Sequence, residues 1–240
     1  MFADEARNVL GCLDVAIGEA RRAGGVDSVV RIGSLPAVPL DRVQRFLVAL
    51  RAREPSLRTE VTHLGSLEQV KRLRTGELDL GIFPLGVSYQ QIRTVPMFPG
   101  EPVVALLRAD HPLAAKDVLT QRDLSDEVLV VFSHTINSAL HDWWLATIDR
   151  GGYRFRGIHE VASTDPRDVV LAVAGGWGIS LGSTTYVAAD GSSASVVPRP
   201  IDPPLSHAEV GVAWRESGPR QLRGLVETVL DVTRELRASG

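Results

Sequence analysis

The feature that most constrains the fold is a regular alternation of short apolar runs with longer amphipathic stretches. The β-branched run VVRIGS at 29–34 has the composition of a buried strand, and residues 35–54 carry apolar side chains at helical spacing. The pattern repeats as LRTEVTHL at 57–64, SLEQVKRLRTGE at 66–77 and LDLGIFPL at 78–85. Strands that alternate with helices across short joints pair in parallel, so we predict an α/β fold with helices covering a sheet.

The alternation restarts in the second half of the chain and indicates a second, smaller α/β unit. Two strand-like runs bracket Pro99 and Gly100, and new strand and helix patterns follow Pro112. The run HAEVGVAWRE and the helical pattern PRQLRGLVETVLDVTREL lie near the C-terminal end. Between Gln91 and these last elements, strands are expected at 91–98, 101–113, 128–132 and 154–163, and helices near 120–124, 138–150 and 166–174.

Composition limits the possible classes of function. A length of 240 residues fits one large α/β domain or two small ones, and a net charge of −3 lacks the basic surplus of most nucleic-acid-binding domains. Cys12 is the single cysteine, which excludes a disulfide within the chain and fits a reducing compartment. No apolar run approaches the roughly 20 residues of a membrane span, and the first residues do not resemble a signal peptide. We expect a soluble, cytoplasmic protein.

Residues 1–25 predict an amphipathic helix separate from this alternation. Apolar side chains recur at helical spacing from Phe2 to Ala20, and Gly24-Gly25 follows as a stop. Acidic residues near its start and arginines near its end suit the helix dipole. Two interpretations are open, because such a helix either packs on its own domain or acts as a linker that pairs with a copy of itself.

The segment GISLG, which contains Ser180, fits the GxSxG pattern of many serine hydrolases. In those enzymes a strand precedes the serine and a helix follows it. Here Asp165-Pro166 is a helix start and Gly175-Gly176 is a helix stop, so Ser180 is expected inside a strand. A serine hydrolase therefore remains only a minor alternative. The six histidines and one cysteine show no metal-ligand spacing, so neither a metal nor another cofactor is expected.

Several motifs occur in the order of a known family. They are VVRIGS at 29–34, GELDLGIF at 76–83, PVVALLRADHPLA at 102–114, STDPRDVVLAVAGGWGISLGS at 163–183 and VGVAWRE at 210–216. Over nearly its whole length, the chain resembles the effector-binding domain of the LysR-type transcriptional regulators.

This resemblance implies an architecture. The family has two Rossmann-like subdomains of the periplasmic-binding-protein type II kind, joined by two crossing strands and preceded by a linker helix, with a small molecule held between the subdomains. Residues 1–25 would be the linker and dimerisation helix. Subdomain I would comprise 28–105 and 207–238, and subdomain II would comprise 106–206.

The resemblance also implies partners. The family reads DNA through a winged helix–turn–helix ahead of the linker helix, and nothing in this sequence matches it. We therefore expect a truncated regulator that contacts DNA only through that missing part and that self-associates into dimers or tetramers. Its expected effector is a small organic molecule such as an aromatic carboxylate. A solute-binding protein of the same fold is the main alternative, although it would need an export signal.

Four turns are candidates for contacts with an effector. In open α/β sheets, ligands bind beyond the carboxyl ends of the strands, where the N-termini of helices offer free amides. The four turns are residues 34–36, 65–66, 133–135 and 163–165. They carry small hydroxyl side chains that suit a carboxylate, although ordinary helix caps are the alternative. Apolar walls are expected from Phe83, Pro84, Val103 and Trp177. The predicted ligand-binding residues are Ser34, Leu35, Pro36, Gly65, Ser66, Phe83, Pro84, Val103, His134, Thr135, Ser163, Thr164, Gly182 and Ser183.

One of these turns departs from the family. His134 and Thr135 follow Ser133 where many members carry a Gly-Ser pair. This difference argues against the family's usual mode of binding a ligand carboxylate at this turn. It also adds an imidazole, a group that ordinarily titrates near neutrality.

Overall fold

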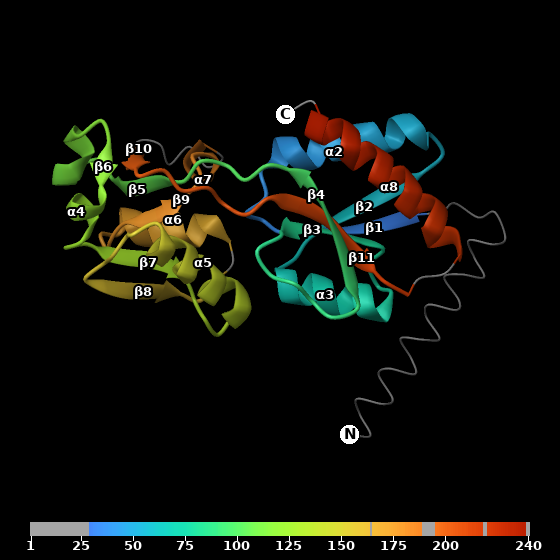
Figure 1. The fold of residues 1–240 in the computed structure, drawn as a ribbon, viewed down its shortest axis with the longest axis horizontal. Coiled ribbons are helices and arrows are strands. Elements are labelled where there is room, and N and C mark those ends of the chain that lie inside the picture. The colour runs from blue at the N-terminus through green and yellow to red at the C-terminus, as the bar shows by residue number, and fades with distance from the viewer. Residues whose placement is uncertain (1–28, 164, 189–194, 218–219, 239–240) are drawn as a thin grey trace, which may run out of the picture. The chain divides into compact units, whose positions relative to one another are not determined.

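The computed structural model describes residues 29–163, 165–188, 195–217 and 220–238. The predicted linker helix at 1–25 and Thr164 lie outside the described residues. The chain forms two compact units, and each is described by itself (Figure 1). The first unit contains the residues up to Pro99 and those from Glu209 onward, and the second unit runs from Gly100 to Ala208.

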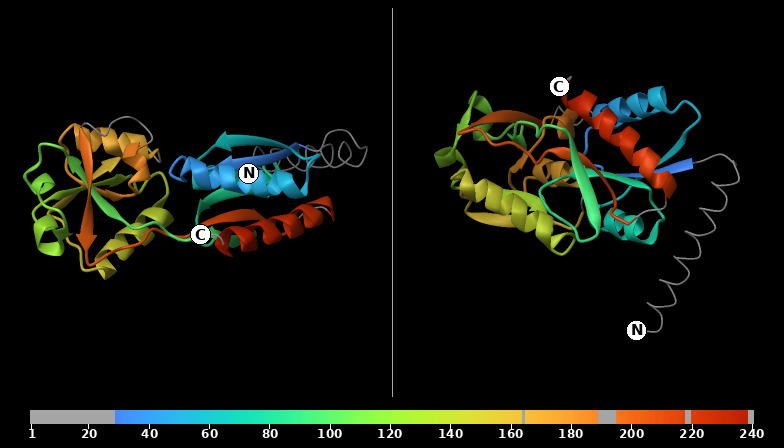
Figure 2. Two further views of the ribbon diagram at one scale, coloured as in Figure 1. Left: turned by 90° about the horizontal axis from the view of Figure 1, so that it is seen from above. Right: turned by 45° about the vertical axis from the view of Figure 1, so that its right-hand side comes forward.

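The first unit is a five-stranded sheet in the order β2-β1-β3-β11-β4. Strand β1 is parallel to β2 and β3, whereas β11 runs antiparallel to both of its neighbours, β3 and β4. Helices α2 and α8 lie on one face of the sheet and α3 lies on the other (Figures 1 and 2). The bounds are β1 Val29–Ser34, α2 Leu40–Arg53, β2 Arg58–His63, α3 Ser66–Thr75, β3 Leu80–Pro84, β4 Ile92–Phe98, β11 Val210–Arg215 and α8 Arg220–Ala238.

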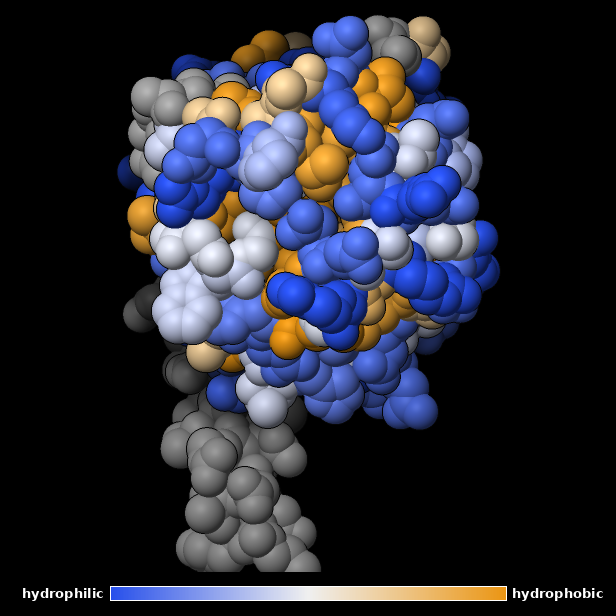
Figure 3. All heavy atoms as spheres, turned by 90° about the vertical axis from the view of Figure 1, so that its left-hand side faces the viewer, coloured by the Kyte–Doolittle hydropathy of each residue, from blue (hydrophilic) through white to orange (hydrophobic). Residues whose placement is uncertain are grey.

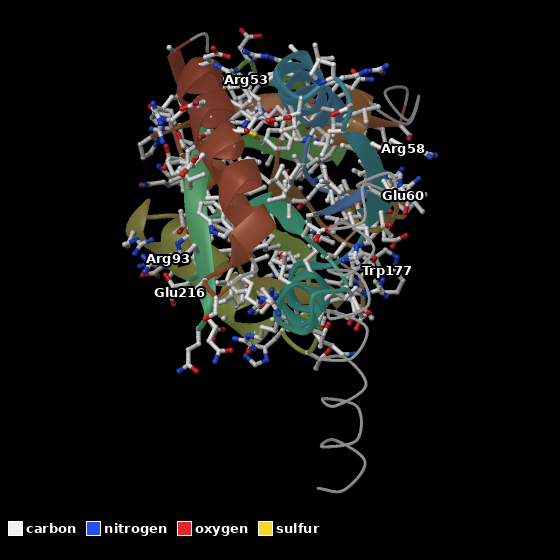
Figure 4. All side chains as sticks on the ribbon, turned by 90° about the vertical axis from the view of Figure 1, so that its right-hand side faces the viewer. Arg53, Arg58, Glu60, Arg93, Trp177 and Glu216 are labelled. Atoms are coloured by element: carbon white, nitrogen blue, oxygen red, sulfur yellow. The ribbon has the colours of Figure 1, made fainter. Side chains whose placement is uncertain are left out.

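The edge of this sheet at β2 is polar. Every residue of β2 is exposed, and Arg58 and Glu60 extend away from the sheet (Figure 4). On the opposite edge strand, β4, Arg93 forms an ion pair with Glu216, which follows β11. Charged side chains at both edges disfavour edge-to-edge pairing with other chains.

The second unit contains two groups of strands. A four-stranded sheet has the order β6-β10-β5-β9, and a parallel pair, β7-β8, joins it through a bridge between Leu129 and Ile179. The space-filling view in Figure 3 shows apolar side chains in small areas between polar ones. The bounds are β5 Val104–Arg108, η1 Pro112–Ala115, β6 Leu119–Thr120, α4 Gln121–Leu124, β7 Val128–Phe132, α5 Ser138–Arg150, β8 Gly157–Val161, α6 Pro166–Ala174, β9 Ser180–Gly182, α7 Thr185–Ala188 and β10 Val196–Asp202.

Helices bury both faces of the second sheet. Along β5, Ala105 and Leu107 pack into a core that includes Trp144 of α5, whereas Leu106 packs into a second core with Val170 of α6. This arrangement explains why the runs PVVALL and VLVVF are continuously apolar instead of alternating with polar residues. The predicted α/β class with two units is confirmed. In the part of the chain that is described, no helix is both long and apolar enough to span a bilayer.

Gln69 ties α3 to the strand ends of the first unit. Its side chain is fully buried, its Nε2 donates to the carbonyl of Leu64 over 2.8 Å, and its Oε1 accepts from the amide of Ile82 over 3.1 Å. Gly33 and Gly81 make room for it, since a Cβ at either position would lie 2.9 Å from an atom of Gln69. The glycines in the motifs RIGS and DLGI therefore serve the packing of one buried amide.

Two passages of the chain lie side by side where the second unit begins and ends. The amide of His207 donates to the carbonyl of Glu101 over 2.9 Å, and the amide of Val103 donates to the carbonyl of Leu205 over 2.9 Å. A Cβ on Gly100 would lie 1.8 Å from the carbonyl oxygen of His207, which is a backbone atom that cannot rotate away.

Replacing Gln69 should destabilise the first unit. Gln69→Leu keeps the volume but leaves the carbonyl of Leu64 and the amide of Ile82 without this partner, and each such buried group costs about 1–3 kcal/mol. The free energy of unfolding in urea measures the loss. Gln44→Leu, at an exposed position of α2, is the matched control, and an equal effect of the two substitutions would contradict this role of Gln69.

Replacing Gly100 should destabilise the second unit. Gly100→Ala forces the two passages apart, and overpacking of this kind costs about 1–3 kcal/mol. Thermal unfolding of Gly100→Ala should occur at a lower temperature than that of Gly157→Ala, since a Cβ at Gly157 meets no atom within 4 Å. Equal midpoints for the two variants would show that the passages tolerate a side chain.

Candidate ligand-binding turns at the carboxyl ends of the strands

Ser34 is the last residue of β1 in the first unit, and its hydroxyl makes no hydrogen bond within the described residues. Its carbonyl accepts from the amide of Leu64 over 3.0 Å, and the next amide, of Leu35, donates to the carbonyl of Ile82 over 3.0 Å. The side chain is only 1% exposed, and among the described residues its Oγ has no hydrogen-bond partner. A buried hydroxyl without a partner is costly, so it requires an explanation.

The start of α3 lies at the same edge as Ser34. Ser34 pairs with His63 at the end of β2, and Gly65 follows one residue after Leu64. Gly65 is the N-cap of α3 in an extended conformation and makes no side-chain cap, and Ser66 is the buried first residue of the helix. The first amides of a helix lack intrahelical partners and attract anions. This edge therefore combines a buried hydroxyl with the positive end of a helix.

The turn after β7 in the second unit is already occupied by a carboxylate. The Ser133 hydroxyl donates to Oε2 of Glu160, from the neighbouring strand β8, over 2.7 Å. Ser133 Oγ also lies 2.9 Å from Oγ1 of Thr135 and accepts from the amide of Thr135 over 3.3 Å. The Ser133 hydroxyl, helped by the backbone amide of His134, holds the pKa of Glu160 below its ordinary range.

Two histidines flank this carboxylate. The side chain of His134 is 51% exposed, whereas that of His141 is 6% exposed. Their rings pack edge to face, with 5.3 Å between the ring centroids. His141 Nε2 lies 3.3 Å from Oε1 of Glu160. Asp142 Oδ1 lies 3.6 Å from His134 Nε2 and 3.5 Å from His141 Nδ1. The turn thus alternates acidic and titratable basic groups.

A second serine of this unit also donates to a carboxylate. The hydroxyl of Ser183, directly after β9, is hydrogen-bonded to Glu101 and lies 2.8 Å from Oγ1 of Thr185. Burial raises the pKa of the nearby Tyr186 phenol, and the charge of Glu101 adds to this effect. Gly182 allows the close approach of that ring, because a Cβ would lie 2.8 Å from Cδ2 of Tyr186.

The predicted hydroxyl groups are not the helix caps. Asn137 caps α5 by accepting from the amide of Leu140, and Asp165 caps α6 by accepting from the amide of Arg167. Ser163 Oγ accepts from the amide of Asp165 over 3.0 Å, so it orders the entry into α6. The simple explanation of these serines as N-caps therefore does not hold for Ser66, Ser133 or Ser163.

The residues expected to form apolar walls lie in different surroundings. Phe83 is a core residue of the first unit and Val103 is a core residue of the second, and Leu35 of the Ser34 turn is also a core residue. Contact of these side chains with a ligand stays a prediction. Trp177 is 61% exposed and stacks on His159 at 4.7 Å. Trp177 precedes β9, whereas Ser183 follows it, so this indole lies at the opposite end of the strand from the candidate turn. Pro36 and Pro84 are partly exposed beside Ser34 and at the end of β3.

Gln69, Glu101, His141 and Glu160 are the polar residues at these turns that sequence analysis did not identify. Glu160 is the next-to-last residue of β8 and His141 lies in the first turn of α5, and neither position carries a sequence motif that signals a site. Ser180 opens β9 and is buried after α6, as predicted, which is not the geometry of a nucleophile elbow. Within the described residues, no group of three or more His, Cys, Asp or Glu side chains is placed to hold a metal ion.

Comparisons with known proteins identify the family. The family model of the LysR substrate binding domain matches residues 23–236. The Hca operon transcriptional activator HcaR of Escherichia coli K12 is 28% identical over 147 residues, which cover 60% of this chain and 49% of that protein. The transcriptional regulator BenM of Acinetobacter baylyi is 27% identical over 185 residues, which cover 75% and 59% respectively. The chain thus spans half to three fifths of the length of these relatives.

Solved structures share the fold. The BenM effector binding domain with its effector benzoate has a TM-score of 0.65 at 22% identity, covering 89% of this chain and 93% of that one. The CcmR regulatory domain of Synechocystis PCC6803 in complex with 2-PG has a TM-score of 0.65 at 20% identity, covering 88% and 99%. With the family model matched from residue 23 to residue 236, the chain belongs to the LysR substrate-binding-domain family.

Proposed function

We propose that this chain is the effector-sensing domain of a LysR-type transcriptional regulator. It binds a small organic acid at the strand-end turns and passes the binding signal to a DNA-binding part of a longer protein. Family membership supports this role, and so do the named functions of the relatives, which are a transcriptional activator and a transcriptional regulator. The fold neighbour solved with benzoate supports an organic anion as the class of effector.

The observation that carries the proposal is the buried Ser34 hydroxyl without a partner beside the first turn of α3. A carboxylate that reaches this edge would accept from the hydroxyl and from free amides of the helix, and it would benefit from the helix dipole. Hydrogen bonds to a charged group are worth about 1.5–3 kcal/mol, so one such bond changes affinity by about tenfold or more. Ser34 is thus a binding residue that the unliganded chain keeps at a cost to its own stability.

The regulator self-associates and contacts DNA through a segment outside this chain, in line with relatives that are named as a transcriptional activator and a transcriptional regulator. A role in transcription places the protein in the cytoplasm. The ligand changes the balance between two states of the domain only if it binds one of them more tightly. The prediction that one effector contacts the turns of both units at once stays a prediction.

Replacing Ser34 should separate binding from stability. Ser34→Ala should leave thermal stability equal or higher without ligand, because it removes a buried hydroxyl that lacks a partner. The same variant should bind an acid effector about tenfold more weakly, and Ser34→Leu should abolish binding by filling the space. A thermal-shift screen of organic acids that includes benzoate measures both effects.

Ser56→Ala, at an exposed position of the first unit, serves as the control. It should keep the ligand-induced shift of the original chain. An acid that stabilises Ser34→Ala and Ser34→Leu as strongly as the original chain would exclude Ser34 from the binding site.

A further inference from the structure

We propose that Glu160 is a built-in carboxylate that selects which ligand group the turn after β7 accepts. This turn disfavours the binding of an anion and favours the binding of a hydrogen-bond donor. Among donors, a protonated amine should bind most tightly. This inference rests on the proposed function, because it names the ligand chemistry of one of the candidate strand-end turns. It assigns Glu160 as a specificity-determining residue.

The Ser133 hydroxyl, which could bind an anion at this turn, already donates its hydrogen bond to Glu160. The hydrogen of the Ser133 hydroxyl points to Glu160 Oε2 at 2.7 Å, and Ser133 Oγ accepts from the amide of Thr135. The backbone amide of His134 also helps to keep the pKa of the Glu160 carboxyl low, after the larger effect of Ser133. A hydroxyl has one hydrogen to donate, so Ser133 cannot hold a second carboxylate while Glu160 stays in place.

The turn already holds two carboxylates, those of Glu160 and Asp142, beside the two imidazoles. An incoming carboxylate would lie beside these carboxylates, and like charges about 4 Å apart near a protein surface repel by about 4 kcal/mol at most. An anion would therefore have to displace Glu160 from Ser133. A cation gains from the same field.

Glu160 can still accept further hydrogen bonds. A carboxylate offers about four lone-pair sites, and the Ser133 hydroxyl occupies one of them. The side chain of Glu160 is 39% exposed, so a ligand can reach it. The buried Nε2 of His141 lies 3.3 Å from Oε1 and, among the described residues, makes no hydrogen bond of normal geometry. The turn therefore presents a fixed acceptor with a polar nitrogen beside it.

The Ser34 edge has the opposite character. There, the serine hydroxyl is free to donate, and no carboxylate of the described residues is hydrogen-bonded to it. At both Ser133 and Ser183, by contrast, the hydroxyl already meets a glutamate. Equal residue types at equivalent strand ends thus prefer ligand groups of opposite charge.

The experiment uses two probes that share a ring and differ in charge, benzylamine and benzoate. The full chain, labelled with ¹⁵N, is titrated with each probe while the amide signals of Thr135 and Ile136 are followed. Benzylamine should shift these signals in the original chain, and Glu160→Gln should weaken its binding about tenfold or more. Benzoate should shift them only in Glu160→Gln, where the charge is gone but the size is kept.

Glu127→Gln is the matched control. Glu127 lies just before β7, at the other end of the strand, with Oε2 3.5 Å from Nε2 of His111. It is thus a second glutamate beside a histidine in the same unit, and its replacement should change neither titration.

Three results would overturn the proposal. They are a benzoate shift at Thr135 that is as strong in the original chain as in Glu160→Gln, benzylamine binding that Glu160→Gln leaves unchanged, and no shift by either probe in either protein. Failure of the proposed function would be seen elsewhere, as acid-induced stabilisation that does not depend on Ser34. The two outcomes are therefore distinguishable.

Discussion

Burial of both faces of each sheet, except at the exposed edge strand β2, is the constraint on which the candidate site depends. Helices α2 and α8 cover one face of the first sheet and α3 covers the other, while α5 and α6 belong to two separate cores around the second. Polar side chains cannot be placed on these faces at low cost, because a buried polar group needs a partner. Binding groups are consequently confined to the strand ends, where backbone amides and small hydroxyls are available. Gln69 meets the same constraint inside the first unit, where it pairs with backbone groups at the strand ends.

The strand-end serines show how neighbours decide chemistry. Ser34 is buried, and its hydroxyl has no hydrogen-bond partner in the part of the chain that the structure describes. Ser133 and Ser183 occupy comparable positions after β7 and β9, yet each hydroxyl meets a glutamate carboxylate. A serine hydroxyl that already donates to a carboxylate has no second hydrogen to donate. It can only accept hydrogen bonds from a ligand. The same residue type therefore supports opposite ligand preferences in the two units.

Local patterns predicted the elements well because strands and helices leave periodic signals. The β-branched runs and the Asp-Pro and Gly-Gly signals located β1, β7, α6 and β9, and the stop at Gly175-Gly176 placed Ser180 in a strand. The apolar walls stay a prediction. Phe83 and Val103 are core residues, and Trp177 lies at the end of β9 opposite to Ser183. An apolar side chain carries no local mark that tells a core position from a ligand wall, since both exclude water.

By itself, the sequence determined the α/β class, the restart in a second unit, the strand-end position of Ser34, Ser133 and Ser183, and the strand position of Ser180. These properties follow from periodicity and from capping residues that act over a few neighbours. Only the tertiary structure decided which partners these groups have. Glu160 is 27 residues from Ser133, and Glu101 is 82 residues from Ser183. Strand pairing brings β8 beside β7 and the start of the second unit beside β9, and hydrogen bonds across such distances in sequence leave no local pattern to detect.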